Sequence, residues 1–154
     1  MINGFTGRYG FLSNFYVYPI QWRDRILRSA EHAYQSEKTT DELERETIYR
    51  AGTPADAKRL GGKKHLKHLA PDWDSIKDGI MLQVLRAKFQ DSELRKLFLE
   101  TRNEELIETN WWGDIYWGVC NGRGKNKLGY ILMQVRGEIQ RENQRLSFEL
   151  LGDS

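Results

Sequence analysis

Two stretches of the chain carry apolar residues at the spacing of one helix face. The first begins near Asp74, and its apolar members are Ile76, Ile80, Val84, Leu85 and Phe89. The second follows Asn126, and its apolar members are Leu128, Ile131, Leu132 and Val135. Steps of three and four residues bring side chains to the same side of a helix. The pattern predicts two helices with these faces in the core. The helix capped by Asp74 is expected to be the longest of the chain.

Shorter helices are predicted from side chains that can cap a first turn. Ser29, Asp41, Thr53 and Asp91 each offer an oxygen to amide groups that a helix N-terminus leaves unbonded. Pro54 suits the position directly after a cap. The predicted helices span residues 29–39, 41–52, 53–61 and a stretch from residue 91 in which Leu94, Leu97 and Phe98 face inward.

Short strands are predicted over residues 16–20, 25–28 and 105–109. Pro19 places the first of them at a sheet edge or a strand end. Arg23 and Asp24 form a turn between the first two strands. Because helices predominate and do not alternate regularly with strands, the pattern is typical of the α+β class. We expect one compact domain over residues 1–154, mostly helical with a small β-sheet.

Composition and charge exclude several classes of protein. The 154 residues carry 24 basic and 22 acidic side chains, a formal charge of +2, too small to favour a nucleic-acid or membrane surface by bulk charge. No stretch approaches the roughly 18 apolar residues that span a bilayer, and the N-terminus lacks the features of a signal peptide. Cys120 is the only cysteine, so no internal disulfide can form. We therefore expect a cytoplasmic protein without a membrane partner.

Candidate metal ligands are few. Cys120 and the three histidines, His32, His65 and His68, do not have the spacing of a zinc site. His65 and His68 also lie in a lysine-rich stretch that would repel a cation. The sequence therefore predicts no metal site.

One face of the helix predicted over residues 29–39 carries polar groups suited to chemistry. Glu31, Tyr34 or Gln35, and Lys38 follow one another at helical spacing and share one side. A solvated surface with loose ion pairs is one interpretation. The other is a site where Glu31 transfers protons or activates water and Lys38 takes part in phosphate, carbonyl or imine chemistry.

Two later segments contain candidate ligands for a flat base and for an anion. Residues 111–118 hold three indoles and Asp114 among glycines. This composition suits stacking walls around a base, or an aromatic core plug with Asp114 as a turn residue. Residues 122–129 combine glycines, basic side chains and a helix N-terminus, which favours an anion such as phosphate. The spacing of a P-loop is missing.

Six short motifs occur in order from Gly10 to about Arg136. They are Phe-Leu-Ser-Asn-Phe at 11–15, Ser-Ala-Glu-His-Ala-Tyr-Gln at 29–35 with Lys38, Trp73, Leu-Arg-Ala-Lys-Phe at 85–89, Asp-Ile-Tyr-Trp-Gly at 114–118, and Gly-Lys-Asn-Lys-Leu-Gly-Tyr-Ile-Leu-Met at 124–133. Each motif alone is weak, whereas six in this order are specific. Together they resemble the NADAR family, also called YbiA-like proteins.

The resemblance implies an α+β fold and an N-glycosidase that uses no metal or organic cofactor. For bacterial YbiA-like proteins, the implied substrates are the first two intermediates of riboflavin biosynthesis, which are ribosylamino-pyrimidine 5′-phosphates. The implied partner is thus a small phosphorylated ribosylamine, cleaved to ribose 5-phosphate and the free base. In other family members the implied reaction removes ADP-ribose from modified guanine in DNA. Both reactions break the bond between ribose C1 and an exocyclic amino nitrogen.

The resemblance also implies four functional positions, which are Glu31, Trp73, Asp114 and Trp117, and the chemistry of the side chains suggests roles for these and other residues. Glu31 would activate water or shuttle protons, and Asp114 would orient the ribose or assist the leaving amine. Trp73 and Trp117 would stack on the base. Lys38 could attack C1 of a ring-opened ribosylamine and form a Schiff base. Candidate ligands of ribose hydroxyls or phosphate are Arg8, Ser13, Asn14 and Asn126. Departures from the family pattern, which bear on substrate identity, are Ala33, Thr39 and the extra indoles Trp111 and Trp112.

Two other functions compete with this prediction. The first is a hydrolase that removes ADP-ribose from guanine in DNA or a nucleotide. It predicts a groove lined by basic residues such as Arg59, Lys63, Lys64 and Lys67. The second is a non-catalytic module that binds ADP-ribose or NAD in the aromatic pocket. Glu31, Lys38 and Asp114 together argue against the second, because binding alone would not need all three.

Overall fold

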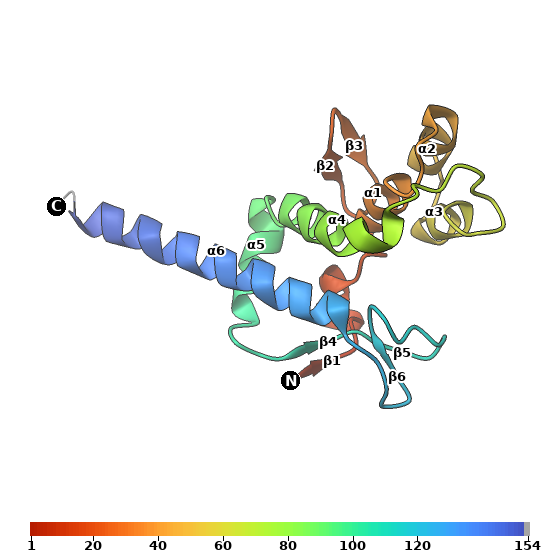
Figure 1. Ribbon diagram of the computed structural model, residues 1–154. Coiled ribbons are helices and arrows are strands. Elements are labelled where there is room, and N and C mark those ends of the chain that lie inside the picture. Colours follow the sequence, from red (N-terminus) through yellow and green to blue (C-terminus); the bar gives the residue numbers. More distant parts are fainter. Residues whose placement is uncertain (153–154) are drawn as a thin grey trace. The chain divides into compact units, whose positions relative to one another are not determined.

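A computed structural model describes residues 1–152, which form two compact units. One unit is Thr6–Lys88, and the other joins Met1–Phe5 to residues 89–152. Helices dominate each unit, and strands occur as short pairs (Figure 1). The predicted α+β class is confirmed, and within the described residues the strands form three two-stranded sheets. A single domain over residues 1–154 stays a prediction.

The unit Thr6–Lys88 is built around its first α-helix. The elements are η1 (Gly7–Leu12), β2 (Ile20–Trp22), β3 (Arg25–Leu27), α1 (Ala30–Ser36), α2 (Glu42–Tyr49), α3 (Pro54–Leu60) and α4 (Trp73–Lys88). Helix α1 contacts α2, α3 and α4, and every one of its residues is buried. A helix covered on all sides must hold its polar side chains with protein partners rather than water.

The helix starts in this unit follow the predicted caps. First-turn amides of α1, α2 and α3 donate to the side-chain oxygens of Ser29, Asp41 and Thr53. Helix α1 ends at Ser36 rather than near residue 39, because residues 38–40 pair with residues 68–70. The Ala70 amide donates to the Lys38 carbonyl at 2.7 Å. Helix α2 likewise ends at Tyr49, before the predicted residue 52.

The strand predicted over residues 16–20 is wrong for most of its length. Strand β2 begins only at Ile20, which pairs with Leu27 in the antiparallel hairpin. Pro19 has no amide hydrogen for a ladder, so regular pairing starts after it. Before it, the Tyr18 amide donates to the Arg28 carbonyl at 3.0 Å. The predicted turn and the second strand are confirmed.

The prediction that Asp74 caps helix α4 is wrong, because the helix starts one residue before it. Trp73 is its first residue, and Asp74 lies in its first turn. Val84 and Leu85 are fully buried as predicted, whereas Ile76 and Ile80 are only half-buried. The prediction that this helix is the longest is wrong, since α6 has 26 residues and α4 has 16. Residues 138–151 contain no glycine or proline to stop α6.

The second unit places α6 against α5 and one strand. Its elements are β1 (Ile2–Asn3), α5 (Ser92–Glu100), β4 (Leu106–Ile107), β5 (Thr109–Asn110), β6 (Val119–Cys120) and α6 (Lys127–Gly152). Strand β1 pairs in parallel with β4, and β5 pairs in parallel with β6. The strand predicted over residues 105–109 is therefore two short strands. The core face predicted for α6 is buried as expected, while Leu97 of α5 is 39% exposed.

Candidate active site

Helix α1 holds a buried carboxylate–amide pair. Glu31 and Gln35 are 6% and 3% exposed, and Gln35 Nε2 donates to Glu31 Oε1 at 2.7 Å. The interpretation of this face as a solvated surface is therefore wrong for these two residues. Gln35 Oε1 is buried without a hydrogen-bond partner in the described structure. Buried polar atoms are rarely left unpaired, so this oxygen is a candidate to bind a donor on a ligand.

Lys38 follows α1 and lies among aromatic rings. Its Nζ is 5.6 Å from the centre of the Tyr34 ring and 6.0 Å from that of Trp73. The ammonium also donates to the Gly61 carbonyl at 3.4 Å. Burial lowers the pKa of Lys38, the charge of Glu31 opposes this shift, and nearby lysines reinforce it. A lysine with a lowered pKa is a stronger candidate for a nucleophilic amine than an exposed lysine.

Trp73 forms one wall beside this lysine. It is 7% exposed, and its ring centre lies 5.3 Å from that of Tyr34, at an interplanar angle of 54°. Most of its surface is thus covered by protein. Its role as a stacking surface for a base stays a prediction.

Asn14 has a buried oxygen beside the start of α1. The Asn14 backbone carbonyl accepts from the Glu31 amide at 3.1 Å, and its Nδ2 lies 3.3 Å from Met81 Sδ. Its Oδ1 is buried without a hydrogen-bond partner in the part of the chain that the structure describes. This oxygen suits a hydroxyl donor, in line with the predicted binding of ribose.

Arg8 and Ser13, two further predicted ligands of the substrate, contact residues of their own unit. Arg8 is exposed, with its guanidinium 4.9 Å from the Tyr9 ring centre. Ser13 accepts from the Phe15 amide through Oγ at 3.1 Å. Its carbonyl accepts from Lys88 Nζ at 2.9 Å. These contacts stabilise the loop before Asn14, and substrate binding by either residue stays a prediction.

Asp114, in the other unit, organises a tight turn. Its Oδ1 accepts from the amides of Tyr116 and Trp117 at 3.0 and 2.9 Å. Its own amide donates to Asn110 Oδ1 at 3.0 Å, and its carbonyl accepts from Asn110 Nδ2 at 2.8 Å. This is the turn role that the sequence left open as an alternative. The catalytic role of Asp114 stays a prediction.

The neighbouring aromatic residues are more exposed than core residues. Trp117 is half-buried, with its ring edge-on to Tyr116 at 4.9 Å. Trp111 is 86% exposed and Trp112 50%, so an aromatic core plug is excluded for these two indoles. Stacking of Trp117 on a base stays a prediction.

Asn126 joins two segments of its unit. Its Oδ1 accepts from the Glu108 amide and its Nδ2 donates to the Leu106 carbonyl, both at 2.9 Å. Its φ of 51° lies in the left-handed region, which asparagine tolerates better than most residues. Because both ends of the amide bind backbone, the structure gives Asn126 a structural role. Its predicted contact with substrate is untested.

One cluster of potential metal ligands was not anticipated from spacing. Ligand atoms of Asp41, Glu44 and His68 lie within 4.8 Å of one another. Glu44 already accepts from the amides of Lys67 and His68 at 2.7 and 3.1 Å. These bonds satisfy the carboxylate without an ion.

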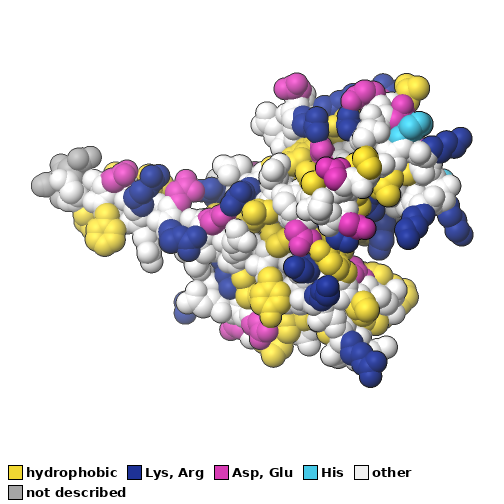
Figure 2. All heavy atoms as spheres, in the orientation of Figure 1, with side chains coloured by type: hydrophobic (Ala, Val, Ile, Leu, Met, Phe, Trp, Pro, Cys, Tyr) yellow, Lys and Arg dark blue, Asp and Glu magenta, His cyan; other side chains and the backbone are white. Residues whose placement is uncertain are grey.

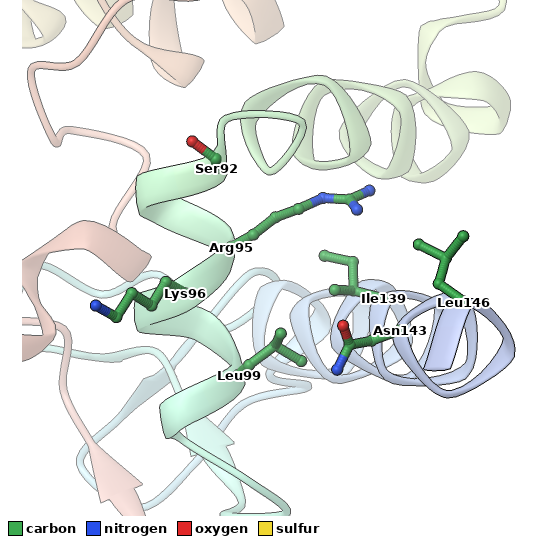
Figure 3. A pocket seen from close by; sticks show the side chains of 7 residues that line it. All are labelled: Ser92, Arg95, Lys96, Leu99, Ile139, Asn143 and Leu146. Carbon is green, nitrogen blue, oxygen red and sulfur yellow. The ribbon is translucent and has the colours of Figure 1, made fainter. Parts of the chain in front are cut away.

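A pocket of about 280 Å³ lies in the unit that contains α5 and α6 (Figure 3). Leu99, Ile139 and Leu146 contribute an apolar lining, and Arg95 is paired with Glu142 at 3.1 Å. None of its lining residues is a predicted site residue, and none is a carboxylate. The chemistry of the α1 face therefore identifies the candidate active site better than the size of this pocket.

Basic side chains gather over α3 and the following loop, residues 61–70 (Figure 2). Arg59, Lys63, Lys64 and Lys67 are all exposed there. The Gly61 carbonyl, which accepts from Lys38, was missed from sequence because nothing in the sequence indicated it. Tyr34 was placed on the same face as Lys38 by its spacing, but it was given no role. Among residues 1–152, no helix has the length and apolar character needed to cross a membrane.

Comparison with known proteins shows close similarity over most of the chain. The NADAR domain family matches residues 4–140. The N-glycosidase YbiA of Escherichia coli strain K12 is 41% identical over 133 residues, which cover 85% of this chain and 82% of that protein. The NMR structure of E. coli YbiA has a TM-score of 0.83 and 39% identity, and the match covers 94% of this chain and 88% of that one.

A longer relative has a different name. A riboflavin biosynthesis protein of Vibrio vulnificus is 37% identical over 134 residues, which cover 86% of this chain and 36% of that protein. The predicted reaction class, an N-glycosyl hydrolase, is confirmed by the relatives of matching length. The match of a family over most of the chain also confirms the resemblance seen in the motifs. The chain therefore belongs to the NADAR domain family.

Proposed function

We propose that the chain hydrolyses the C1–N bond of ribosylamino-pyrimidine 5′-phosphates of riboflavin biosynthesis and releases ribose 5-phosphate. The observation that carries this proposal is the buried Glu31–Gln35 pair one turn from Lys38, whose pKa is lowered by burial. A proton-transfer group and a nucleophilic amine on the same face suit the chemistry of a ribosylamine. The name of the Vibrio relative supports the choice of substrate. A cytoplasmic location is part of the proposal.

The proposed reaction passes through an imine on Lys38. A ring-opened ribosylamine is itself an imine at C1. The neutral amine of Lys38 attacks C1, the new C1–Nζ bond forms, and the C1–N bond to the pyrimidine breaks as Glu31 transfers a proton to the leaving amine. Water then adds to C1, and breakage of C1–Nζ returns free Lys38 and the aldehyde of ribose 5-phosphate. The balance is one water consumed for each bond cleaved.

Other residues have supporting roles in this proposal. Asn14 Oδ1 accepts from a ribose hydroxyl, since it is buried without a hydrogen-bond partner among residues 1–152. Trp73 and Tyr34 keep water away from the amine and so favour its neutral form. The roles of Asp114 and Trp117 in orienting the ribose and stacking on the base follow from the family resemblance.

The experiment is turnover of the two riboflavin intermediates, with ribose 5-phosphate as the measured product. Borohydride added during turnover should trap a ribose-phosphate adduct on Lys38, visible by mass spectrometry. Lys38→Arg should be inactive, because a guanidinium cannot form the imine. Near-wild-type turnover by Lys38→Arg without an adduct would instead assign the attack on C1 to water activated by Glu31.

The alternative substrate is ADP-ribosylated guanine. The exposed basic side chains of α3 and its following loop are the observation that favours it, because they could contact phosphates of a nucleic acid. An ADP-ribosylated guanosine oligonucleotide belongs in the same assay. Release of ADP-ribose without release of ribose 5-phosphate from the riboflavin intermediates would favour this alternative.

A further inference from the structure

Two lysines outside the predicted site have side chains whose charges act on Lys38. Lys58 lies on α3, three residues before Gly61, whose carbonyl accepts from Lys38. Lys77 lies on α4, four residues after Trp73, whose ring lies 6.0 Å from Lys38 Nζ. Residues three and four apart share a helix face. Both lysines therefore lie one helical turn from a group that Lys38 contacts.

The electrostatics agree with this placement. Burial is the main cause of the lowered pKa of Lys38, and the charges of Lys58 and Lys77 lower it further, while Glu31 acts in the opposite direction. The charges of Lys58 and Lys77 therefore repel that of Lys38. A bound anion would reduce this repulsion.

Lys58 is exposed and Lys77 is half-buried. Lys58 Nζ lies 5.8 Å from the centre of the Phe15 ring, and Phe15 is 41% exposed. Lys77 Nζ lies 3.3 Å from Asp74 Oδ1, and the Asp74 side chain is 95% exposed. An ion pair with so exposed a partner contributes little stability. A phosphate can therefore take the place of this partner at small cost.

We propose that Lys58 and Lys77 bind the 5′-phosphate of the substrate while Lys38 attacks C1. The proposal rests on the proposed function and adds the phosphate subsite. The phosphate is the dianionic group of the proposed substrate, and two lysines on separate helices can each donate a charge-assisted hydrogen bond to it. Lys38 is then the amine at C1 and not the phosphate ligand.

The test compares substrates with and without the phosphate. Lys58→Gln and Lys77→Gln should each raise KM for the 5′-phosphate substrate about tenfold, the effect of one lost charge-assisted hydrogen bond. KM for the dephosphorylated substrate should change less than about twofold, since that substrate lacks the group bound. Lys96→Gln is the matched control, because Lys96 is exposed on α5 and belongs to the other unit. Its KM values should equal those of the wild type.

A binding measurement separates this proposal from the proposed function. Titration calorimetry should show weaker binding of ribose 5-phosphate to both variants and unchanged binding to Lys96→Gln. If the wild type turns over neither substrate and the variants still bind ribose 5-phosphate more weakly, the subsite stands and the proposed function fails. If turnover occurs and both variants bind ribose 5-phosphate as the wild type does, the subsite is wrong. Equal losses on both substrates by variants with wild-type melting temperatures would also overturn it.

Discussion

Gly61 is the position where one methyl group should most disturb the buried carboxylate. A Cβ atom at Gly61 would lie 2.0 Å from Gln35 Oε1 and 2.9 Å from Gln35 Cδ. Gln35 is 3% exposed, so its amide has little room to move away. Gly61→Ala should therefore displace the amide and break its 2.7 Å hydrogen bond to Glu31.

The expected cost in stability combines three contributions. Overpacking a filled core costs about 1–3 kcal/mol, and loss of a hydrogen bond to a charged group costs about 1.5–3 kcal/mol. The φ of Gly61 is −82°, which alanine adopts freely. Alanine has fewer conformations than glycine in the unfolded chain, which stabilises the folded protein by about 0.4–1 kcal/mol. The free energy of unfolding should fall by about 2–5 kcal/mol, the net of these values. Turnover should fall by about 100-fold through misplacement of Glu31.

Urea unfolding and steady-state kinetics measure these two effects. Gly52→Ala is the control, because a Cβ at Gly52 meets no atom within 4 Å. Gln35→Ala removes the amide and leaves only the Cβ of residue 35, which lies 3.1 Å from the new methyl group of Gly61→Ala. In this background Gly61→Ala should lower the free energy of unfolding by less than about 1 kcal/mol, so the effects of the two substitutions are not additive. Equal costs in both backgrounds, or a Gly61→Ala protein as stable and active as the wild type, would refute the reasoning.

Four further predictions concern protonation, a backbone clamp and metals. If neutral Lys38 is the nucleophile, kcat/KM should rise as the pH passes the lowered pKa of Lys38. Lys77→Gln should move that rise to higher pH, because the charge of Lys77 lowers this pKa. An unchanged pH profile would contradict the electrostatic coupling between the two lysines. Burial also lowers the pKa of His32, so below about pH 6.5 the unfolded chain binds a proton at His32 more readily than the folded protein does. The free energy of unfolding should therefore fall as the pH drops through this range. Urea titrations should show a weaker pH dependence for His32→Gln. Asn126→Ala should lower the free energy of unfolding by about 2–4 kcal/mol, since it removes two hydrogen bonds to the backbone and places alanine at a positive φ. Asn126→Gly removes the same hydrogen bonds without the strain, so its free energy of unfolding should fall less. Turnover should survive EDTA, and loss of activity restored by one metal would show that a metal site exists.

Much of the local structure could be predicted because its causes lie within a few residues of sequence. Ser29, Asp41 and Thr53 cap helices since an N-cap oxygen needs only an amide two or three residues ahead. The apolar series of α6 is buried because 3.6-residue periodicity already defines its inward face. Motif order along the chain was likewise sufficient to identify the family. The aromatic and β-branched residues 16–18 misled the strand prediction, because regular pairing starts only after Pro19.

What only the tertiary structure decided is which distant groups meet. The spacing of Glu31, Gln35 and Lys38 placed them on one face, but spacing alone favoured a solvated surface over a buried site. Packing of α1 against α3 and α4 buried the first two and brought the Gly61 carbonyl and the Trp73 ring to the third. The pKa of Lys38 depends on this burial and on charges from other helices, since desolvation and Coulomb interactions act through space. The sequence by itself therefore determined most helix starts and the chemical groups, and the packing of helices determined the environment in which those groups react.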